Sequence, residues 1–445
     1  MNINYEFETI SAIATPLGIG GVGVIRISGT KAFDIVKKMF SKKNLQAGKI
    51  EHGWIKENDQ KIDEVIILPF KAPNSYTGED VIEIQCHGGL KIVKKILDLT
   101  ISNGARLAQK GEFTKRAFLN KKMDLSQAEA VLDIIDAKTT HFAQKSANNL
   151  SGALAKEIKD IKSNLFTLYS RIIAAVDFPE DVKEPQYDYL ETESQNAITK
   201  IEKVLKNANS SNIMRQGIKI AIAGCPNAGK SSLFNALLNL DRAIVTEIPG
   251  TTRDVIQESV DIDGIPATLI DTAGIREDEN LDKVEAIGIE YTKNCVENAD
   301  LILFLFDWSK GFNQNDATIY ELIENKPHIK IATKSDLAEI PNPECLNVSS
   351  KTGYNIEELK EKIKEAVIDK NTLETEFVTN QRQQECLINA CNALKNALVG
   401  IKNSELQDLI SIDLKAALLS LDEITGEVIT DEILENIFEH FCIGK

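Results

Sequence analysis

The segment from Ile218 to Leu238, IKIAIAGCPNAGKSSLFNALL, constrains the fold of this chain more than any other. It begins as an apolar strand, continues as the loop Gly224-x-x-x-x-Gly229-Lys230-Ser231 and ends as a helix, which is the context that a phosphate-binding loop requires. Such a loop surrounds the phosphates with backbone N–H groups. Its lysine reaches the β- and γ-phosphates, and its serine hydroxyl binds Mg²⁺. The segment therefore predicts an α/β domain that binds a nucleoside triphosphate.

The residues that follow supply the other parts of a nucleotide hydrolase in the expected order. TEIPGTTRD places Thr252 in a loop that can close over Mg²⁺, and the strand in TLIDTAGI ends at Asp271–Gly274, near the metal. LILFLFD is apolar throughout, which is typical of a strand buried on both faces. IKIATKSD and CLNVSSKTG lead to Asp336, which can accept from N1 and N2 of guanine, and to Ser349–Lys351, which can frame the base. Because adenine lacks the N2 amine, we predict a GTPase domain over residues 217–370.

Helical patterns flank the predicted GTPase domain on both sides. Ser126 and Glu129 have the spacing of a capping box, and helical spacing continues to about residue 213. It resumes after residue 373, where one helix face carries Ile410, Leu414, Ala417, Leu418 and Leu421. We therefore predict a multidomain chain with a GTPase domain inserted into a helical domain. Its parts are an N-terminal α+β domain (1–120), the first helical half (121–216), the GTPase domain (217–370) and the second helical half with the terminal Cys-Ile-Gly-Lys (371–445).

The N-terminal domain carries a glycine pattern that imitates a dinucleotide site. Gly18-x-Gly20-x-x-Gly23 matches that fingerprint, but the residues after Gly23 alternate like a strand where the motif requires a helix. We expect a glycine-rich turn between strands, which weighs against a flavin or nicotinamide enzyme. Arg26, Glu83 and Lys122 lie in this domain without any binding motif, so spacing alone allows them to be solvated surface residues.

Composition excludes several classes of protein. The chain has 445 residues, a net charge of −16 and seven scattered cysteines without a C-x-x-C pair, so we expect reduced thiols and no zinc site. The start lacks the basic and apolar regions of a secretory signal, and no apolar stretch is long enough to span a bilayer. We therefore expect a cytoplasmic protein. Its acidic balance means that an RNA would need a partner or a local basic patch for binding.

The motifs of the predicted GTPase domain resemble the five G motifs of TRAFAC-class GTPases. Two departures matter: Thr333 stands where the fourth motif usually has Asn, and Ile275 stands where Ras-like enzymes use a water-orienting Gln. Selectivity for guanine still depends mainly on Asp336. Hydrolysis must be organised in another way, and Asn227 in the phosphate loop could help to hold a monovalent cation there. Asn227 could instead only stabilise the turn of the loop.

The whole chain closely resembles the MnmE (TrmE) family of tRNA modification GTPases. The resemblance is carried by GGVGVIRISG, PNSYTGEDVIEIQCHGG, GEFTKRAFLN, the inserted GTPase domain and the terminal FCIGK. Apart from Thr333, the chain departs from the family at Ile19, where an Arg is usual, and at Ser350, where an Ala is usual.

For the N-terminal domain, the family resemblance implies a folate-binding homodimer. Members act with the FAD enzyme MnmG (GidA), as a heterotetramer, to add an aminomethyl or carboxymethylaminomethyl group at C5 of the wobble uridine of certain tRNAs. By matching motifs, Arg26, Glu83, Lys122 and Lys445 would contact a 5-formyl- or methylene-tetrahydrofolate, with the FCIGK tail folded back to this pocket. Cys442 would be a catalytic nucleophile, although a structural thiol is an equal alternative.

For the GTPase domain, the resemblance implies Mg²⁺ at Ser231 and Thr252, and K⁺ at Asn227, Thr246, Ile248 and Thr251. Lys230 and Glu285 would be catalytic, with Glu285 orienting the attacking water; without the resemblance, Glu285 would be interpreted as an exposed helical glutamate. The residues expected to contact GTP are Asn227, Ala228, Gly229, Lys230, Ser231, Ser232, Thr246, Glu247, Ile248, Pro249, Gly250, Thr251, Thr252, Asp271, Thr272, Ala273, Gly274, Thr333, Lys334, Ser335, Asp336, Ser349, Ser350 and Lys351. The alternative function is that of a GTPase in ribosome assembly or another RNA pathway.

Overall fold

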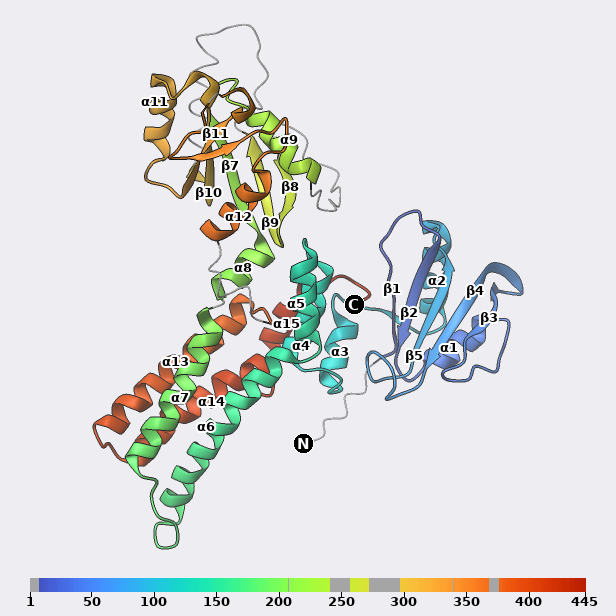
Figure 1. Ribbon diagram of the computed structural model, residues 1–445. Coiled ribbons are helices and arrows are strands. Elements are labelled where there is room, and N and C mark those ends of the chain that lie inside the picture. The colour runs from blue at the N-terminus through green and yellow to red at the C-terminus, as the bar shows by residue number, and fades with distance from the viewer. Residues whose placement is uncertain (1–7, 207, 241–256, 272–296, 339, 368–375) are drawn as a thin grey trace. The chain divides into compact units, whose positions relative to one another are not determined.

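The computed structural model describes residues 8–206, 208–240, 257–271, 297–338, 340–367 and 376–445 (Figure 1). These residues form two compact units. One runs to Leu132 and also includes Leu419–Lys445, and the other is Asp133–Leu418. The bounds of the four parts expected from the sequence stay a prediction. None of the helices described has both the length and the apolar composition needed to cross a lipid bilayer.

The first unit contains a six-stranded sheet with the order β3-β4-β5-β2-β1-β6. Neighbouring strands are antiparallel, except that β1 and β6 are parallel. The strands are β1 (Ile10–Ile13), β2 (Val22–Ser28), β3 (Glu51–Glu57), β4 (Gln60–Phe70), β5 (Val81–His87) and β6 (Arg106–Leu107). Because β2 follows the glycine-rich turn directly, the prediction that no helix follows Gly23 is confirmed.

One face of this sheet is covered by α1 (Ala32–Met39) and α2 (Leu90–Ser102). Ile25 and Ile27 of β2 belong to the hydrophobic core on this side. Because successive side chains on a strand point to opposite faces, Arg26 lies on the other face. There it is paired in register with Glu83 of β5. The alternation of apolar and polar residues thus places two opposite charges side by side on the face opposite α1 and α2.

The first unit also contains α3 (Glu112–Leu119), the start of α4 (Leu125–Ile135) and α15 (Asp431–Glu439). Phe438 and Phe441 pack against Leu125 and Ala128 in a small core. The capping box predicted at Ser126 and Glu129 is wrong. The amide N–H of Gln127 donates to Asp124, and the N–H of Asp124 donates to the Gln127 side chain, so the box lies two residues earlier.

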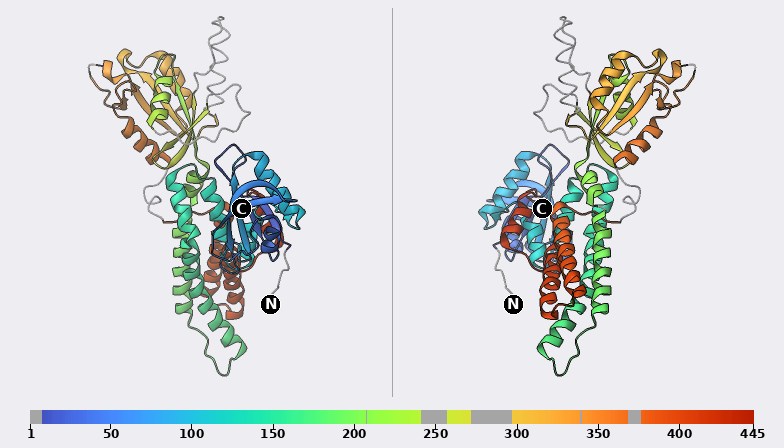
Figure 2. Two further views of the ribbon diagram at one scale, coloured as in Figure 1. Left: turned by 90° about the vertical axis from the view of Figure 1, so that its right-hand side faces the viewer. Right: turned by 90° about the vertical axis from the view of Figure 1, so that its left-hand side faces the viewer.

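The second unit contains the remaining helices, among which α7 packs against both α6 and α13 (Figure 2). Those outside the GTPase domain are α5 (Thr140–Leu150), α6 (Ala153–Asp177), α7 (Tyr187–Lys206), α8 (Ala208–Gln216), α13 (Gln381–Lys402) and most of α14 (Gln407–Thr425). The apolar face predicted for α14 is buried at Ile410, Leu414, Ala417, Leu418 and Leu421. This agrees with helical segments on both sides of the GTPase domain in the sequence.

The GTPase domain is built on a second six-stranded sheet, with the order β12-β11-β10-β7-β9-β8. All neighbours are parallel except β8 and β9, which form a hairpin with Asp263 and Gly264 at positive φ, as a tight Asp-Gly turn requires. The strands are β7 (Ile218–Gly224), β8 (Gln257–Ile262), β9 (Ile265–Asp271), β10 (Leu301–Asp307), β11 (His328–Thr333) and β12 (Leu346–Val348).

Helices cover both faces of this second sheet. Leu303 and Leu305 of β10 share a core with α9 (Lys230–Leu240) and α12 (Ile356–Val367). Phe304 and Phe306 share the opposite core with α11 (Gln314–Ile323). The prediction that β10 is buried on both faces is therefore confirmed. The arrangement is a doubly wound α/β domain, in which ligands bind beyond the carboxyl ends of the parallel strands.

Candidate functional site

The phosphate loop leaves β7 at Gly224 and enters α9 at Lys230. The loop runs close to β10, because a Cβ atom on Gly224 would meet the Leu305 carbonyl oxygen at 2.2 Å. Asn227 and Gly229 have φ values of 63° and 94°, in the left-handed region. Turns of this kind direct backbone N–H groups into a concave, anion-binding surface. The local geometry therefore matches the phosphate cradle predicted from the sequence.

Lys230 is held inside this loop. Its side chain is largely buried, and its Nζ donates to the carbonyl oxygens of Gly224 at 2.8 Å and Cys225 at 2.9 Å. These two bonds fix the ammonium group over the concave side of the loop, at the N-terminus of α9. A bound phosphate would meet both this cation and the positive end of the helix dipole.

Thr333, which stands where the fourth motif usually has Asn, ties three segments of the domain together. Its Oγ1 lies 2.7 Å from the Ala228 carbonyl oxygen and 2.9 Å from that of Phe306. The residue is buried at the end of β11. Since the hydroxyl bonds to the phosphate loop and to β10, Thr333 holds the guanine-recognition segment against the phosphate cradle.

Asp336 lies in the segment expected to recognise guanine. Its Oδ1 accepts a hydrogen bond from the Ser349 hydroxyl at 2.7 Å, and the carboxylate is exposed. Ser349 is itself fixed, because its N–H donates to the Tyr354 carbonyl and its Oγ accepts from the Thr352 N–H. The structure thus brings together the residues predicted to hold the base, and Ser350 and Lys351 follow directly in the same turn.

Lys334 is positioned by an ion pair with Asp307 at the end of β10. The Nζ–Oδ2 distance is 2.7 Å, and Asp307 also accepts from the N–H and hydroxyl of Ser309. Burial of the Asp307 carboxyl acts to raise its pKa, but the hydrogen bonds from Lys334 and Ser309 outweigh burial and lower the pKa. The carboxylate is therefore charged at neutral pH and keeps Lys334 in place.

Several predicted site residues lie outside the described residues. They are Thr246, Glu247, Ile248, Pro249, Gly250, Thr251, Thr252, Thr272, Ala273, Gly274 and Glu285. The backbone of Asp271 ends β9, where it is paired with Ile222 of β7. Ser231 and Ser232 lie in the first turn of α9, directly after Lys230, and Ser335 begins the short turn that contains Asp336.

Cys225 is a residue of the phosphate loop that the sequence did not single out. Burial raises the pKa of its thiol to about 12, and a hydrogen bond to the carboxylate of Asp316, in the first turn of α11, acts in the same direction. The thiol therefore stays protonated and unreactive beside the phosphate cradle. No sequence signal could show this, because Asp316 is far from Cys225 along the chain.

A second candidate site lies in the N-terminal domain, where a cavity of about 370 Å³ opens beside β5. It brings together two of the predicted folate residues, Glu83 and Lys122. The Nζ of Lys122 donates to the Pro73 carbonyl oxygen at 3.0 Å. The full lining is Phe70, Asn74, Ser75, Tyr76, Val81, Glu83 and Lys122.

Arg26 lies next to this cavity, and its guanidinium group contacts a carboxylate and two aromatic rings. Its Nε and Nη2 atoms both lie 2.8 Å from Oε1 of Glu83. The guanidinium group also lies over the rings of Tyr76 and Phe113, at 5.1 and 5.6 Å from their centroids. Burial raises the pKa of Tyr76, although its hydrogen bond with Thr114 and the nearby charge of Arg26 act in the opposite direction. Tyr76 therefore stays neutral.

The FCIGK tail packs beside the same arginine. Nη1 of Arg26 donates to the Gly444 carbonyl oxygen at 3.3 Å, and the Phe113 N–H donates to the Lys445 carbonyl oxygen at 3.2 Å. Phe441 is buried in the core with Phe438, whereas Cys442 is exposed. The tail is therefore an ordered part of the first unit, and Arg26 links it to the pocket residue Glu83. The roles of these residues toward a folate stay a prediction.

Two family models match this chain. One describes the MnmE helical domain and matches residues 125–442, and the other describes the GTP-binding protein TrmE N-terminus and matches residues 9–122. The chain belongs to the MnmE family. Curated MnmE relatives include the tRNA modification GTPase MnmE of Caldicellulosiruptor saccharolyticus, 42% identical over 99% of this chain and 100% of its own length. The protein of the same name from Clostridioides difficile is 42% identical, over 98% and 99% of the two chains.

Membership of the MnmE family agrees with the observed architecture. A TrmE-type N-terminal domain, MnmE-type helices and a P-loop GTPase sheet all occur in one chain, as the sequence predicted. Among solved structures, a variant of Era from Aquifex aeolicus bound to GDP and AlF4⁻ is 28% identical, covering 40% of this chain and 66% of that one, with a TM-score of 0.28. By its family and by its curated relatives, this chain is a GTPase of the MnmE family.

Proposed function

We propose that this MnmE-family GTPase is stimulated by K⁺ and acts, with MnmG as its partner, in the modification of the tRNA wobble uridine. The observation that carries the proposal is the presence of two distinct sites in one family member. One is a phosphate cradle with a guanine-recognition segment, and the other is a cavity lined by Glu83 and Lys122, next to Arg26, which also bonds to the C-terminal tail.

The GTPase site supports binding and hydrolysis of GTP through its own residues. Lys230 is already fixed over the cradle, and it would neutralise charge that develops on the β- and γ-phosphates. Asp336 would accept from N1 and N2 of guanine, because its carboxylate is exposed and oriented by Ser349. We propose Ser231 and Thr252 as Mg²⁺ ligands, and Glu285 as the residue that orients water.

A potassium site would involve Asn227, together with Thr246, Ile248 and Thr251. Asn227 is exposed and adopts the left-handed conformation, so its side-chain amide is accessible to solvent. An amide oxygen is a suitable ligand for a hard cation. A cation bound there would supply the positive charge that an arginine finger supplies in other GTPases.

The N-terminal cavity has properties that suit a tetrahydrofolate derivative. Its volume of about 370 Å³ falls within the usual range of roughly 300–1,000 Å³ for small-molecule sites. Glu83 can accept hydrogen bonds from the amino and ring N–H groups of a pterin. Arg26, Lys122 and Lys445 are cations that suit the carboxylates of the folate glutamate. The folate would supply a one-carbon unit to C5 of the uridine.

The assembly that we propose is a homodimer through the N-terminal domain and a heterotetramer with MnmG, with tRNA as the substrate of the complex. The net charge of −16 is consistent with an RNA that is bound mainly by the partner. The cytoplasm is the proposed compartment.

Mass spectrometry of wobble-uridine nucleosides in total tRNA tests this proposal. Deletion of the protein from its host should abolish aminomethyl-type groups at C5, and the wild-type gene should restore them. Unchanged nucleosides would favour a GTPase in ribosome assembly. Complementation with Cys442→Ser separates the two interpretations of this exposed thiol. Full restoration excludes a nucleophile. Complete loss, with normal GTP turnover and unchanged amide exchange of residues 441–445, favours a nucleophile over a structural thiol.

A further inference from the structure

The segment 71–80 forms one wall of the N-terminal cavity and lies outside the regular strands. It contributes Asn74, Ser75 and Tyr76 to the lining. Two hydrogen bonds lie within the segment itself. Ser75 Oγ donates to the Glu79 carbonyl oxygen, and the Ala72 N–H donates to the Asp80 carboxylate. The shape of the cavity therefore depends on what holds this segment against the rest of the domain.

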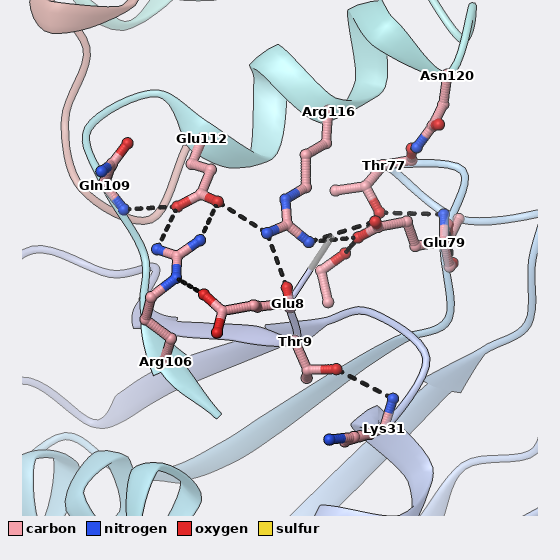
Figure 3. A network of polar contacts seen from close by, with 12 residues as sticks. Glu8, Thr9, Lys31, Thr77, Glu79, Arg106, Gln109, Glu112, Arg116 and Asn120 are labelled. Atoms are coloured by element: carbon pink, nitrogen blue, oxygen red, sulfur yellow. Dashed lines mark hydrogen bonds and ion pairs between the residues drawn. The ribbon is translucent and has the colours of Figure 1, made fainter. Parts of the chain in front are cut away.

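Arg116, on α3, points toward Glu79 of this segment (Figure 3). Its Nη1 lies 3.0 Å from Oε2 of Glu79, and its Nη2 lies 2.8 Å from both Oε1 of Glu112 and the Glu8 carbonyl oxygen. The Arg116 side chain is only 1% exposed. Burial of a guanidinium group is costly unless its donors are paired, and the bonds of Nη1 and Nη2 supply this pairing, so the geometry of Arg116 depends on these partners.

The Glu79 carboxylate is shared between Arg116 and the sheet. Ser28, at the end of β2, donates from its hydroxyl to Oε2 of Glu79 at 2.6 Å. The Ser28 hydroxyl also lies 2.7 Å from the Thr77 hydroxyl. The Glu79 carboxylate thus joins the pocket segment to both α3 and β2.

Two other residues on or just after α3 bind the same segment. The Thr114 hydroxyl lies 2.9 Å from the Tyr76 hydroxyl, and Asn120 Nδ2 donates to the Thr77 carbonyl oxygen at 2.7 Å. The N-terminal end of α3 binds the tail, since the N–H groups of Gly111 and Phe113 donate to the carbonyl oxygens of Cys442 and Lys445. Helix α3 therefore contacts the pocket segment and the tail at once.

We propose that Arg116 is a positioning residue for the N-terminal cavity: through Glu79 it sets the place of Tyr76 and the 71–80 segment, and so the affinity for a folate. This inference rests on the proposed folate function. Arg116 does not line the cavity, and it acts through Glu79 without touching the ligand. The sequence GEFTKRAFLN contains α3, and under this inference α3 is the helix that supports the pocket segment.

Glu79→Gln and Arg116→Lys test this inference, and Arg106→Lys is the matched control. The Glu79→Gln variant keeps the size of the side chain but removes its charge. If Arg116→Lys does not fold, Glu79→Gln alone still tests the inference. Arg106 binds the same Glu112 carboxylate, at 2.7 and 3.0 Å, but its described bonds go to Glu8, Leu107 and Glu112 instead of the 71–80 segment. Both arginine variants should lower thermal stability, so stability alone does not separate them.

Binding of 5-formyl-tetrahydrofolate is measured by calorimetry, well below the melting temperature of each variant, and amide exchange of 71–80 is measured without ligand. We expect Glu79→Gln and Arg116→Lys to raise Kd at least about tenfold, equivalent to roughly one lost hydrogen bond, and to speed exchange in 71–80. Arg106→Lys should change neither by more than about twofold. The control for folding is the amide exchange of the strands β2 and β5 in the same unit, which should stay slow in every variant.

Wild-type Kd and wild-type exchange in Glu79→Gln would overturn the role of Arg116 while leaving the folate proposal in place. Faster exchange with an unchanged Kd would make the Arg116 contacts purely structural, which also overturns it. Absence of folate binding to the wild-type protein would overturn the proposed folate function, and the inferred control of folate affinity with it. In that case the exchange of 71–80 still decides separately whether Arg116 holds this segment.

Discussion

Asp336 shows how one side chain can be prepared for a ligand before it binds. Its Oδ1 is held by the Ser349 hydroxyl, so the carboxylate is oriented without closing off its exposed side. An oriented acceptor loses little conformational entropy when the base binds, which favours affinity. Thr333 contributes in a different way, because its bond to the Ala228 carbonyl joins the base-binding segment to the phosphate loop.

Asp336→Asn should change the nucleotide preference of the GTPase site from guanine to xanthine. The Asn amide cannot accept from both N1 and N2 of guanine, but it can donate to the C2 carbonyl of xanthine. Loss of one charged hydrogen bond should weaken GTP binding by about 10- to 100-fold. Affinities for fluorescent GTP and XTP analogues measure the change, and an unchanged preference for GTP would remove Asp336 from the base site.

At the scale of elements, the tail and α3 depend on each other. The tail reaches its place beside Arg26 only because Gly444 adopts a φ of 99° with its α-carbon against the Ile13 carbonyl of β1. A side chain at this position would be strained by the backbone and would also collide, since an added Cβ lies 2.2 Å from that oxygen. The position therefore requires glycine for two independent reasons.

Gly444→Ala should detach the tail from α3. The left-handed conformation alone costs an alanine about 1–2 kcal/mol, and the collision with Ile13 adds to this. We expect faster amide exchange at residues 441–445 and loss of wobble-uridine modification, with GTP turnover unchanged. Gly18→Ala is the control, because an added Cβ there meets no atom within 4 Å. Equal exchange rates in the two variants would show that the tail tolerates a side chain at 444.

At the scale of the whole molecule, the two sites lie in different compact units of one chain. The GTPase sheet belongs to Asp133–Leu418, whereas the N-terminal cavity and the tail belong to the other unit. The ligand affinity of each site can therefore be measured separately. Nucleotide binding reports on the GTPase site, and folate binding reports on the N-terminal cavity. Coupling between them would appear as a change in the affinity of one ligand when the other is bound.

GTP turnover of the full chain should depend on the monovalent cation. If a cation at Asn227 replaces an arginine finger, turnover in K⁺ should exceed turnover in Na⁺ by about tenfold or more. Asn227→Ala should remove this difference while leaving GTP affinity within about threefold, because the phosphate contacts of the loop come mainly from its backbone and Lys230. Steady-state phosphate release in matched KCl and NaCl buffers measures it. Equal rates in the two salts would contradict the cation mechanism.

The features that the sequence predicted well are those set by neighbouring residues. The strand before Gly224 and the helix after Lys230, the strand after the glycine turn and the buried face of α14 all follow from local periodicity and from glycine spacing. The misplaced capping box at Ser126 belongs to the same scale. Two polar residues, Asp124 and Ser126, both lie at the start of α4, and the side chain of Asp124 formed the cap.

The features that needed the tertiary structure join residues far apart in the chain. The sequence alone determined that this chain contains a GTP-binding loop, flanking helices and an unusual tail. Only the register of β2 and β5 places Arg26 against Glu83, and only packing brings Glu8, Glu79 and Glu112 around Arg116. The periodicity of apolar and polar residues along the sequence does not show which distant residues pair. Strand register and the burial of a charge are decided by the folded chain as a whole.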